Sequence, residues 1–240
     1  RAISEAKEHV HLETFIIRDD EIGRPIADLL LRKRAQGVQV KLIFDSFGCL
    51  KTPDSFFDRL RAGGIEVYEF NPVSIFDVLG RWAIHNRDHR KILVVDGEVA
   101  FTGGINFYHV YAKSPSSLSA SGEADGDLYW RDAHIRIEGP AVAEFQKVFL
   151  ELWNLRGAQN LDHSNYFSPL EENGDDLVRV ISSSPGQPVP NIYAAYFSAI
   201  MNAEKTIHIT QAYFLPGEDI LGALSRSARK GVDVKIVLPG

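Results

Sequence analysis

Residues 85–106 carry the side chains whose types and spacing best suit a chemical reaction, and they read HNRDHRKILVVDGEVAFTGGIN. One residue separates His89 from Lys91, and Asp96 follows after four more. An imidazole can attack phosphorus and form a covalent phosphohistidine, which divides one displacement into two easier steps. A lysine ammonium is a compact charge that suits the non-bridging oxygens of a phosphate. These residue types therefore indicate transfer or hydrolysis of a phosphodiester.

The spacing fits this chemistry if the segment forms a strand. Residues i and i+2 of a strand point to the same face, so His89 and Lys91 can approach one phosphate together. Asn106 can donate a neutral hydrogen bond to the same phosphate oxygens. Gly103 and Gly104 have no side chain and would let the backbone come close to the site.

The third residue of the motif, Asp96, is expected to have a different role. With Gly97 it separates two apolar runs, 91–95 and 98–102, and an Asp-Gly pair between such runs predicts a hairpin turn. We expect Asp96 to support the motif structurally rather than to contact phosphorus.

A repeated pattern predicts the elements that position this motif. Residues 6–17 resemble residues 203–214, and residues 26–44 resemble residues 220–238. Each pair of blocks reads as a strand, a helix ended by glycine, and a second strand. The short apolar strands predict burial on both faces, as in a mixed or parallel sheet under helices. Further patterns predict helices at 54–62 and 140–156 and strands at 65–70 and 133–137.

Composition describes an ordinary globular protein and limits its partners. Of the 240 residues, 45% are apolar and 24% charged, and the net charge of −6 argues against a dedicated nucleic-acid binder. A local basic group can still bind an anion. The basic group consists of Arg81, Arg87, Arg90 and Lys91. The three arginines could equally be solvated surface residues, whereas the lysine belongs to the motif. The single cysteine, Cys49, is expected to be a packing residue, and no apolar run approaches the roughly 20 residues of a membrane span.

The repeat predicts two lobes. Residues 1–160 would form a first lobe with the complete motif, and residues 177–240 would begin a second lobe that stops before its own motif. The polar residues 157–176 read as the linker between them, and the Ser- and Gly-rich residues 113–127 as a surface loop. Because the chain starts with Arg1 and ends just after a strand pattern, we expect the parent protein to be longer.

The motif H-x-K-x4-D-x6-G-G-x-N, matched at each fixed position, resembles the signature of the phospholipase D superfamily. The stretches that are similar to its bacterial cardiolipin synthase branch are LETFII, AFTGGIN, WRDAHIRIEGPAV and GVDVKIVLPG. The resemblance implies an α/β phospholipase D fold, with a mixed central sheet flanked by helices on both faces. It implies two lobes that share one active site, and chemistry that uses no metal and no cofactor.

The resemblance also implies roles for particular residues. In the family, an acidic residue on the strand after the motif orients the catalytic histidine, and Asp132 occupies that place here. Glu13 ends the first predicted strand near the family's site, where a role in the site and simple surface placement are both open. One histidine acts as nucleophile, which we expect to be His89. The other must come from a second H-x-K-x4-D motif, in a missing C-terminal half or in another chain.

The expected substrate is a phospholipid such as phosphatidylglycerol, taken from a membrane surface. The resemblance implies phosphatidyl transfer and a membrane-associated location at the bacterial cell membrane, with no membrane-spanning segment in residues 1–240. The apolar residues 73–84 could be core or an apolar wall that contacts lipid. Three alternatives stay open: a phospholipase D-type hydrolase, a nuclease of the same superfamily, and a non-catalytic lipid-binding half.

Overall fold

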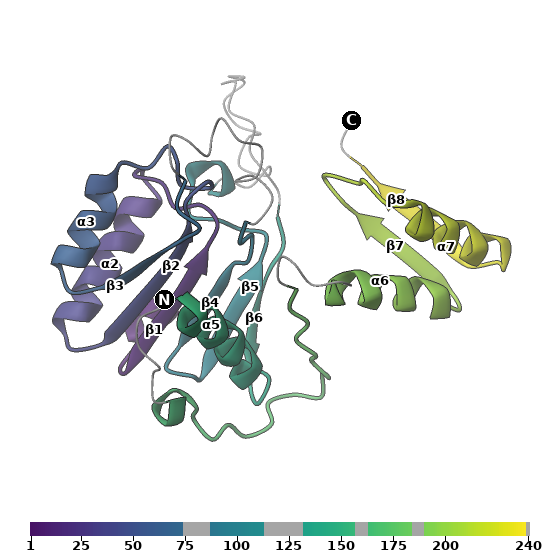
Figure 1. The fold of residues 1–240 in the computed structure, drawn as a ribbon. Helices are drawn as coiled ribbons and strands as arrows, with labels where there is room; N and C mark the ends of the chain where they lie inside the picture. The colour runs from purple at the N-terminus through teal and green to yellow at the C-terminus, as the bar shows by residue number, and fades with distance from the viewer. Residues whose placement is uncertain (74–86, 113–131, 157–162, 184–189, 239–240) are drawn as a thin grey trace, which may run out of the picture. The chain divides into compact units, whose positions relative to one another are not determined.

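The computed structural model describes residues 1–73, 87–112, 132–156, 163–183 and 190–238. The chain divides into two compact units, Arg1–Val180 and Ile181–Gly240 (Figure 1). The predicted loop at 113–127 lies outside the described residues, as do all but Val73 of the predicted apolar segment at 73–84.

The first unit contains one sheet, four α-helices and two 3-10 helices among its described residues. The strands are β1 (His9–Thr14), β2 (Gln39–Asp45), β3 (Glu66–Phe70), β4 (Ile92–Val95), β5 (Val99–Gly103) and β6 (His134–Glu138). The helices are α1 (Ala2–Glu5), α2 (Gly23–Ala35), α3 (Asp54–Ala62), α5 (Val142–Arg156), η1 (His109–Tyr111) and η3 (His163–Tyr166).

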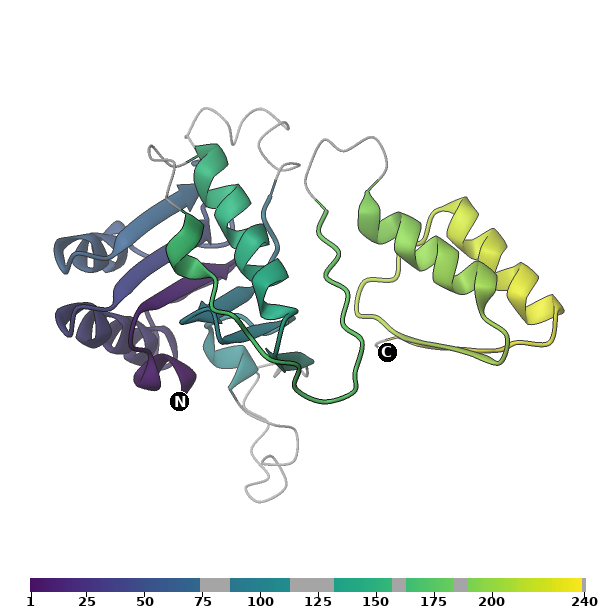
Figure 2. The ribbon, with the colours of Figure 1, turned by 90° about the horizontal axis from the view of Figure 1, so that it is seen from below.

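The six strands form a mixed sheet in the order β3-β2-β1-β4-β5-β6. The first three strands are parallel, and the next three pair antiparallel to their neighbours. Helices α2 and α3 cover one face, and α5 covers the other (Figure 2). The predicted mixed α/β sheet with helices on both faces is therefore confirmed.

Alternation along β1 sorts its side chains between the two faces. Val10 and Leu12 join the apolar core under α2 and α3, where Phe44 stacks on Phe57 with ring centroids 3.7 Å apart. Cys49 belongs to the same core and is buried, as the sequence predicts. Burial raises the pKa of its thiol to about 12, so this sulfur stays protonated and acts as a packing atom.

The opposite face of β1 is polar and lies under α5. His9 and His11 are both buried, and the side-chain amide of Gln146 bridges them, with Nε2 2.8 Å from Nδ1 of His11. The ring of His11 stacks on Phe149 with centroids 4.7 Å apart. Burial lowers the pKa of both imidazoles, so they are neutral and help to dock α5 on the sheet.

The first unit runs to Val180 rather than ending at residue 160, because side chains of the predicted linker pack on the sheet. The hydroxyl of Tyr166 donates to Oε1 of Gln39 at 3.0 Å, and Ser168 Oγ donates to the carbonyl of Asp96 at 3.2 Å. Leu170 and Val180 pack against the core between the sheet and α5. Because this segment is mostly polar, the sequence did not predict these few contacts with the sheet.

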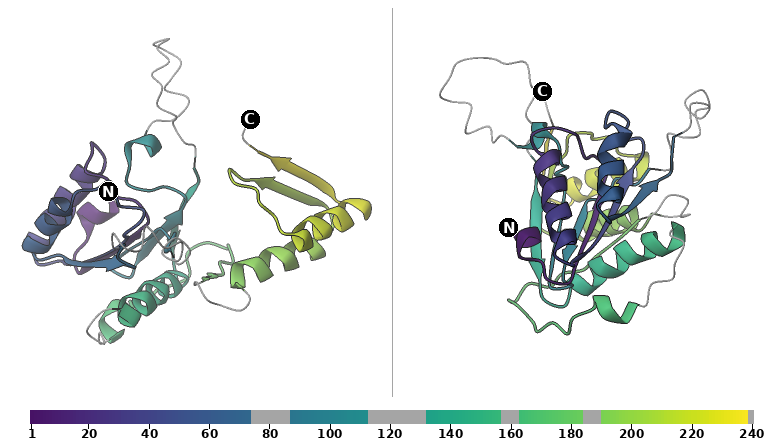
Figure 3. Two further views of the ribbon diagram at one scale, coloured as in Figure 1. Left: turned by 45° about the horizontal axis from the view of Figure 1, so that its top comes forward. Right: turned by 90° about the vertical axis from the view of Figure 1, so that its left-hand side faces the viewer.

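The second unit contains helices α6 (Asn191–Asn202) and α7 (Glu218–Arg229) and the parallel strands β7 (Thr206–Thr210) and β8 (Asp233–Val237). Both helices pack on the pair of strands (Figure 3). His208 pairs with Lys235, the two residues that correspond in the repeat to His11 and Lys41, which pair in β1 and β2. The two units therefore share the register of their strands as well as their sequence pattern, which supports the predicted internal duplication.

Among the described residues, no helix is both long enough and apolar enough to cross a bilayer.

Candidate active site

Strand directions bring most of the predicted site residues to one edge of the sheet, called here the site edge. Strands β1, β2, β3 and β5 end at this edge, and β4 and β6 begin there. The residues at the site edge lie at the ends of these strands or just outside them, and they are Glu13, Asp45, Asp88, His89, Arg90, Lys91, Gly103, Gly104 and Asp132. Asp96 follows β4 and therefore lies at the opposite edge.

His89 and Lys91 lie next to each other just before β4. Lys91 Nζ is 3.2 Å from Nδ1 of His89 and donates to the carbonyl oxygen of His89 at 2.6 Å. The Phe15 ring packs against both, with its centroid 4.5 Å from the His89 ring and 5.3 Å from Lys91 Nζ. The imidazole is exposed while the lysine is buried. An anion that reaches the exposed ring would therefore meet the ammonium group as well.

The surroundings adjust the protonation of both groups. Burial and the Lys91 charge lower the pKa of His89, against the opposing effects of Asp88 and Asp132. The imidazole is therefore neutral at pH 7, as a nucleophile must be. Burial lowers the pKa of Lys91 to about 8, although the nearby carboxylates act in the other direction. The ammonium keeps its charge at neutral pH and loses it in mildly alkaline solution.

Three buried carboxylates at the site edge extend the site beyond the motif. Glu13 is 1% exposed, so the alternative of simple surface placement is wrong. Burial and the neighbouring Asp88 raise its pKa well above the usual range, while Arg90 lowers it. Asp45 ends β2, and its carboxylate accepts hydrogen bonds from the backbone N–H of Gly48 at 3.0 Å and of Asp88 at 2.9 Å. Our sequence analysis missed Asp45 and Asp88, although acidic residues that end or precede apolar strands were a usable signal.

The basic group predicted around the motif is largely engaged inside the protein. Arg90 Nε lies 2.7 Å from Oε1 of Glu13 and donates to Oδ1 of Asp88 at 2.9 Å. Arg87 donates to the carbonyl of Asn71 at 2.7 Å, and its side chain is 10% exposed. Neither arginine is a solvated surface residue, and Lys91 is the described cation of this group nearest to His89. Arg81 lies outside the described residues.

The two glycines of the motif make room for the start of β6. A Cβ on Gly103 would collide with the carbonyl of Ala133, and a Cβ on Gly104 would collide with the carboxylate of Asp132. The backbone N–H of Gly104 donates to the carbonyl of Ala133 at 2.9 Å. The glycines thus allow the Asp132 carboxylate to pack against the end of β5. The negative charge of Asp132 acts on the imidazole of His89 and raises its pKa. In the described part of the chain, however, the side chain in polar contact with that ring is Lys91.

Asn106 lies deeper than the sequence suggested. It is buried, its Oδ1 accepts the backbone N–H of Ile16 at 3.1 Å, and its Nδ2 donates to the hydroxyl of Tyr111 at 2.9 Å. The backbones of Ile16 and Phe107 also hydrogen-bond at 3.1 Å. These bonds join the segment after β1 to the segment after β5, which holds Phe15 near His89. Donation by Asn106 to a phosphate, as the motif suggested, stays a prediction.

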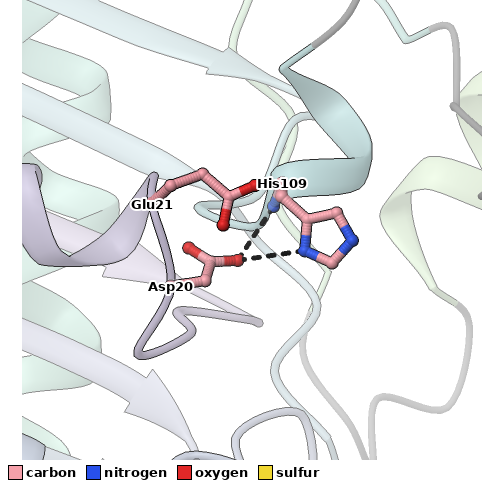
Figure 4. A group of neighbouring side chains, drawn as sticks. All are labelled: Asp20, Glu21 and His109. Carbon is pink, nitrogen blue, oxygen red and sulfur yellow. Dashed lines mark hydrogen bonds and ion pairs between the residues drawn. The ribbon is translucent and has the colours of Figure 1, made fainter.

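The same two segments meet again at Asp20 and His109 (Figure 4). Oδ2 of Asp20 accepts the backbone N–H of His109 at 3.0 Å and lies 3.4 Å from its Nδ1, while Oδ1 accepts the backbone N–H groups of Ile22 and Gly23. With Glu21, these side chains place three possible metal ligands within 4.8 Å of one another. Because both carboxylate oxygens of Asp20 already accept hydrogen bonds, we regard the cluster as a connection between the two segments.

Asp96 fastens the far edge of the sheet. Its carboxylate accepts the backbone N–H groups of Lys7 at 2.7 Å, Glu8 at 2.8 Å and His9 at 2.8 Å. Its backbone has a φ of +54°, a left-handed conformation that aspartate tolerates better than most residues. The structure does not bring Asp96 together with His89 and Lys91, and its contacts are those of a support for the hairpin.

Comparisons with known proteins agree with this arrangement. The family model described as "Cardiolipin synthase, PLD-like domain" matches residues 1–153 and 196–240. The cardiolipin synthase of Geobacillus thermodenitrificans is 36% identical over 239 residues, which are 99% of this chain and 45% of the relative. That of Alkalihalophilus pseudofirmus is 35% identical over 241 residues, which are 100% of this chain and 46% of the relative.

A solved structure extends the likeness to the fold. The phosphatidylserine synthase of Haemophilus influenzae Rd KW20 superposes with a TM-score of 0.64 at 14% identity, covering 99% of this chain and 57% of that one. The chain spans about half the length of the curated relatives it matches. With the matched motif and the mixed sheet, these likenesses show that the chain belongs to the cardiolipin synthase family of phospholipase D-like domains.

Proposed function

We propose that the full protein transfers a phosphatidyl group between two phosphatidylglycerol molecules at the surface of the bacterial cell membrane. The observation that supports this most directly is the pair formed by an exposed, neutral His89 and a buried, charged Lys91 at one edge of the sheet. Membership of the cardiolipin synthase family favours a phospholipid over a nucleic acid as the substrate.

In the proposed first step, a ring nitrogen of His89 attacks phosphorus and the bond to the glycerol headgroup breaks. The departing glycerol oxygen takes a proton from an acid that the second motif of the full protein would supply. In the second step, a hydroxyl of another phosphatidylglycerol headgroup gives its proton to the group that acted as the acid in the first step and attacks the phosphohistidine. The bond between phosphorus and the ring nitrogen breaks, which forms cardiolipin and frees His89. Lys91 would bind the non-bridging oxygens in both steps, where negative charge is greatest.

Asp132 would act when the phosphate is bound. In the contact between Lys91 and His89, the ammonium donates and Nδ1 accepts, which leaves the ring proton on Nε2. Attack by Nε2 requires that the proton be on Nδ1 instead. We propose that a bound phosphate draws the ammonium away. Through exchange with water, Nε2 then loses its proton and Nδ1 gains one, and the Nδ1–H donates a hydrogen bond to Asp132. Gly104 supports this role because only glycine leaves room for that carboxylate.

Product analysis tests the proposed reaction on the full-length protein. Phosphatidylglycerol labelled in the phosphate is incubated with the enzyme in detergent micelles, and the lipids are separated. Labelled cardiolipin with release of glycerol is the expected result. Labelled phosphatidic acid would mean that water is the acceptor and the protein a hydrolase. If neither lipid forms, the lipid assignment fails, and a plasmid-nicking assay would then test the nuclease alternative.

The pKa of Lys91 predicts the alkaline side of the activity profile. Because the charged form of lysine exists below its pKa, kcat/KM should fall above about pH 8, by roughly tenfold at pH 9. Lys91→Arg should lower the rate at pH 7 because the geometry changes, yet it should move the fall to higher pH because arginine keeps its charge. The measurement is kcat/KM from pH 6 to 10, with the exposed Lys147→Arg as control. A fall at the same pH in Lys91→Arg would assign it to another group.

A further inference from the structure

The segment that carries His89 has no regular secondary structure, yet three strand ends hold it. Residues 87–91 precede β4, whose first residue is Ile92. The backbone N–H of Asp88 donates to Asp45 at the end of β2, and Arg87 donates to the carbonyl of Asn71 just after β3. Arg90 forms the third connection, to Glu13 near the end of β1.

The connection through Arg90 joins two buried carboxylates at the site edge. Its Nε lies 2.7 Å from Glu13 and 2.9 Å from Asp88, and the side chains of these two carboxylates are 0% and 7% exposed. The Nε–H is aligned with Asp88, so the carboxylate of Glu13 is an ion-pair partner without an aligned hydrogen bond. A buried carboxylate that loses the cation paired with it is strongly unfavourable. Glu13 and Asp88 therefore hold the guanidinium in one place.

The place of the guanidinium decides where the neighbouring side chains point. Glu13 is the register partner of Ile92, and Ile92 packs in the core beneath α5. Arg90 therefore reaches the α5 side of the sheet. The residues that flank it, His89 and Lys91, instead meet Phe15 and each other. Arg90 meets Asp88 while its two neighbours, His89 and Lys91, meet each other, so fixing the Arg90 side chain also constrains the two residues bonded to it.

We propose that Arg90 is a positioning residue: held by Glu13 and Asp88, it fixes the orientation of His89 and Lys91 toward the phosphate. This role rests on the proposed phosphatidyl transfer. The proposal assigns a function to Arg90, the residue that the motif leaves unspecified between His89 and Lys91. It also assigns a function to Glu13, a buried glutamate that is in direct contact with neither of them. Because an error of about 1 Å in a reacting group can reduce a rate by about 10²-fold, a loose Arg90 should be costly for turnover.

The test uses the full-length protein with Arg90→Met, Glu13→Gln and the double variant. Arg90→Met should lower the Tm, because Glu13 and Asp88 both lose their cation, and should reduce kcat by about 10²-fold with little change in KM. In the double variant Asp88 is the one carboxylate of this pair left without the guanidinium, so the Tm should recover in part while kcat stays low. Arg59→Met is the matched control, since its ion pair with Asp28 is about half exposed at 45% and 48%. Recovery of kcat together with the Tm would show that the ion pair serves stability alone and would overturn the proposal.

A second measurement does not depend on lipid chemistry. Diethyl pyrocarbonate modifies neutral imidazoles, so the pH dependence of modification at His89, read by mass spectrometry, gives its pKa. Burial and Lys91 lower this pKa, so an imidazole released from its position should titrate closer to the usual value in the double variant. An unchanged His89 titration would overturn the positioning role. If the wild type forms no lipid product, the proposed function fails, while this titration still decides whether Arg90 positions His89.

Discussion

Replacing Asp96 with alanine should destabilise the first unit by roughly 3–5 kcal/mol, because it orphans one buried and two partly buried backbone donors, and an orphaned buried donor costs about 1–3 kcal/mol. The variant removes the acceptor of three backbone N–H groups at Lys7, Glu8 and His9. A domain is stable by only about 5–15 kcal/mol, so the loss is a large part of the total. The measurement is denaturant unfolding of the full-length protein, with activity per folded molecule measured under native conditions.

Two comparisons make this prediction sharp. Asp58→Ala removes an exposed ion pair with Arg61 and should change stability by less than about 0.5 kcal/mol. Asp96→Asn keeps one carbonyl oxygen and suits the positive φ, so it should fall between wild type and Asp96→Ala. If Asp96→Ala were as stable as the wild type but inactive, a direct part in the chemistry would replace the structural role.

The second large effect is expected at His89. His89→Ala should reduce kcat by at least about 10⁴-fold, because a missing nucleophile removes the covalent route altogether. Stability should change little, since the imidazole is exposed and touches mainly Phe15 and Lys91. The wild type, quenched during turnover with phosphate-labelled lipid, should carry an acid-labile, base-stable label on the peptide that contains residue 89.

His134→Ala is the matched control for this experiment. His134 begins β6 at the same edge of the sheet and is also exposed, but it does not belong to the motif. Its replacement should leave both the labelled peptide and most of the rate unchanged. If the label in the wild type maps to a histidine outside residues 1–240, that histidine is the nucleophile, and His89 would instead be the residue that protonates the leaving group.

The elements that carry the motif were predictable because their signals are local. Two apolar runs and the Asp96-Gly97 turn between them predicted the β4–β5 hairpin, and glycines after helices predicted the repeated strand-helix-strand units. Family resemblance added the mixed sheet, which the register of six strands confirms. These features depend on neighbours in sequence or on a matched pattern, and both are visible in one chain.

The partners of the charged residues were not predictable, because they depend on which strand ends meet. Arg87 and Arg90 read as candidates for substrate binding, but Asn71 and Glu13, which lie on or just after other strands, engage them, together with Asp88 two residues from Arg90. For the same reason the extent of the first unit was not predictable, because Tyr166, Ser168, Leu170 and Val180 anchor a polar segment on the sheet through contacts with residues far away in the sequence. The reactive pair of His89 and Lys91 was predictable from the sequence, whereas the side chains that hold this pair in place were identified from three-dimensional contacts.

The place of β1 in the sheet has a consequence for synthesis on the ribosome. Although β1 is made before the other strands of the first unit, it lies between β2 and β4, and the backbone N–H groups of Lys7, Glu8 and His9 at its start bind a carboxylate 87 to 89 residues further along the chain. The buried histidines of β1, His9 and His11, contact the side-chain amide of Gln146 on α5, which is made more than 130 residues later. Contacts over such separations form slowly and leave strands unpaired in the meantime. In the first unit, the central strand β1 is therefore without its β4 neighbour while the chain is being made, and it needs protection from aggregation before α5 is complete.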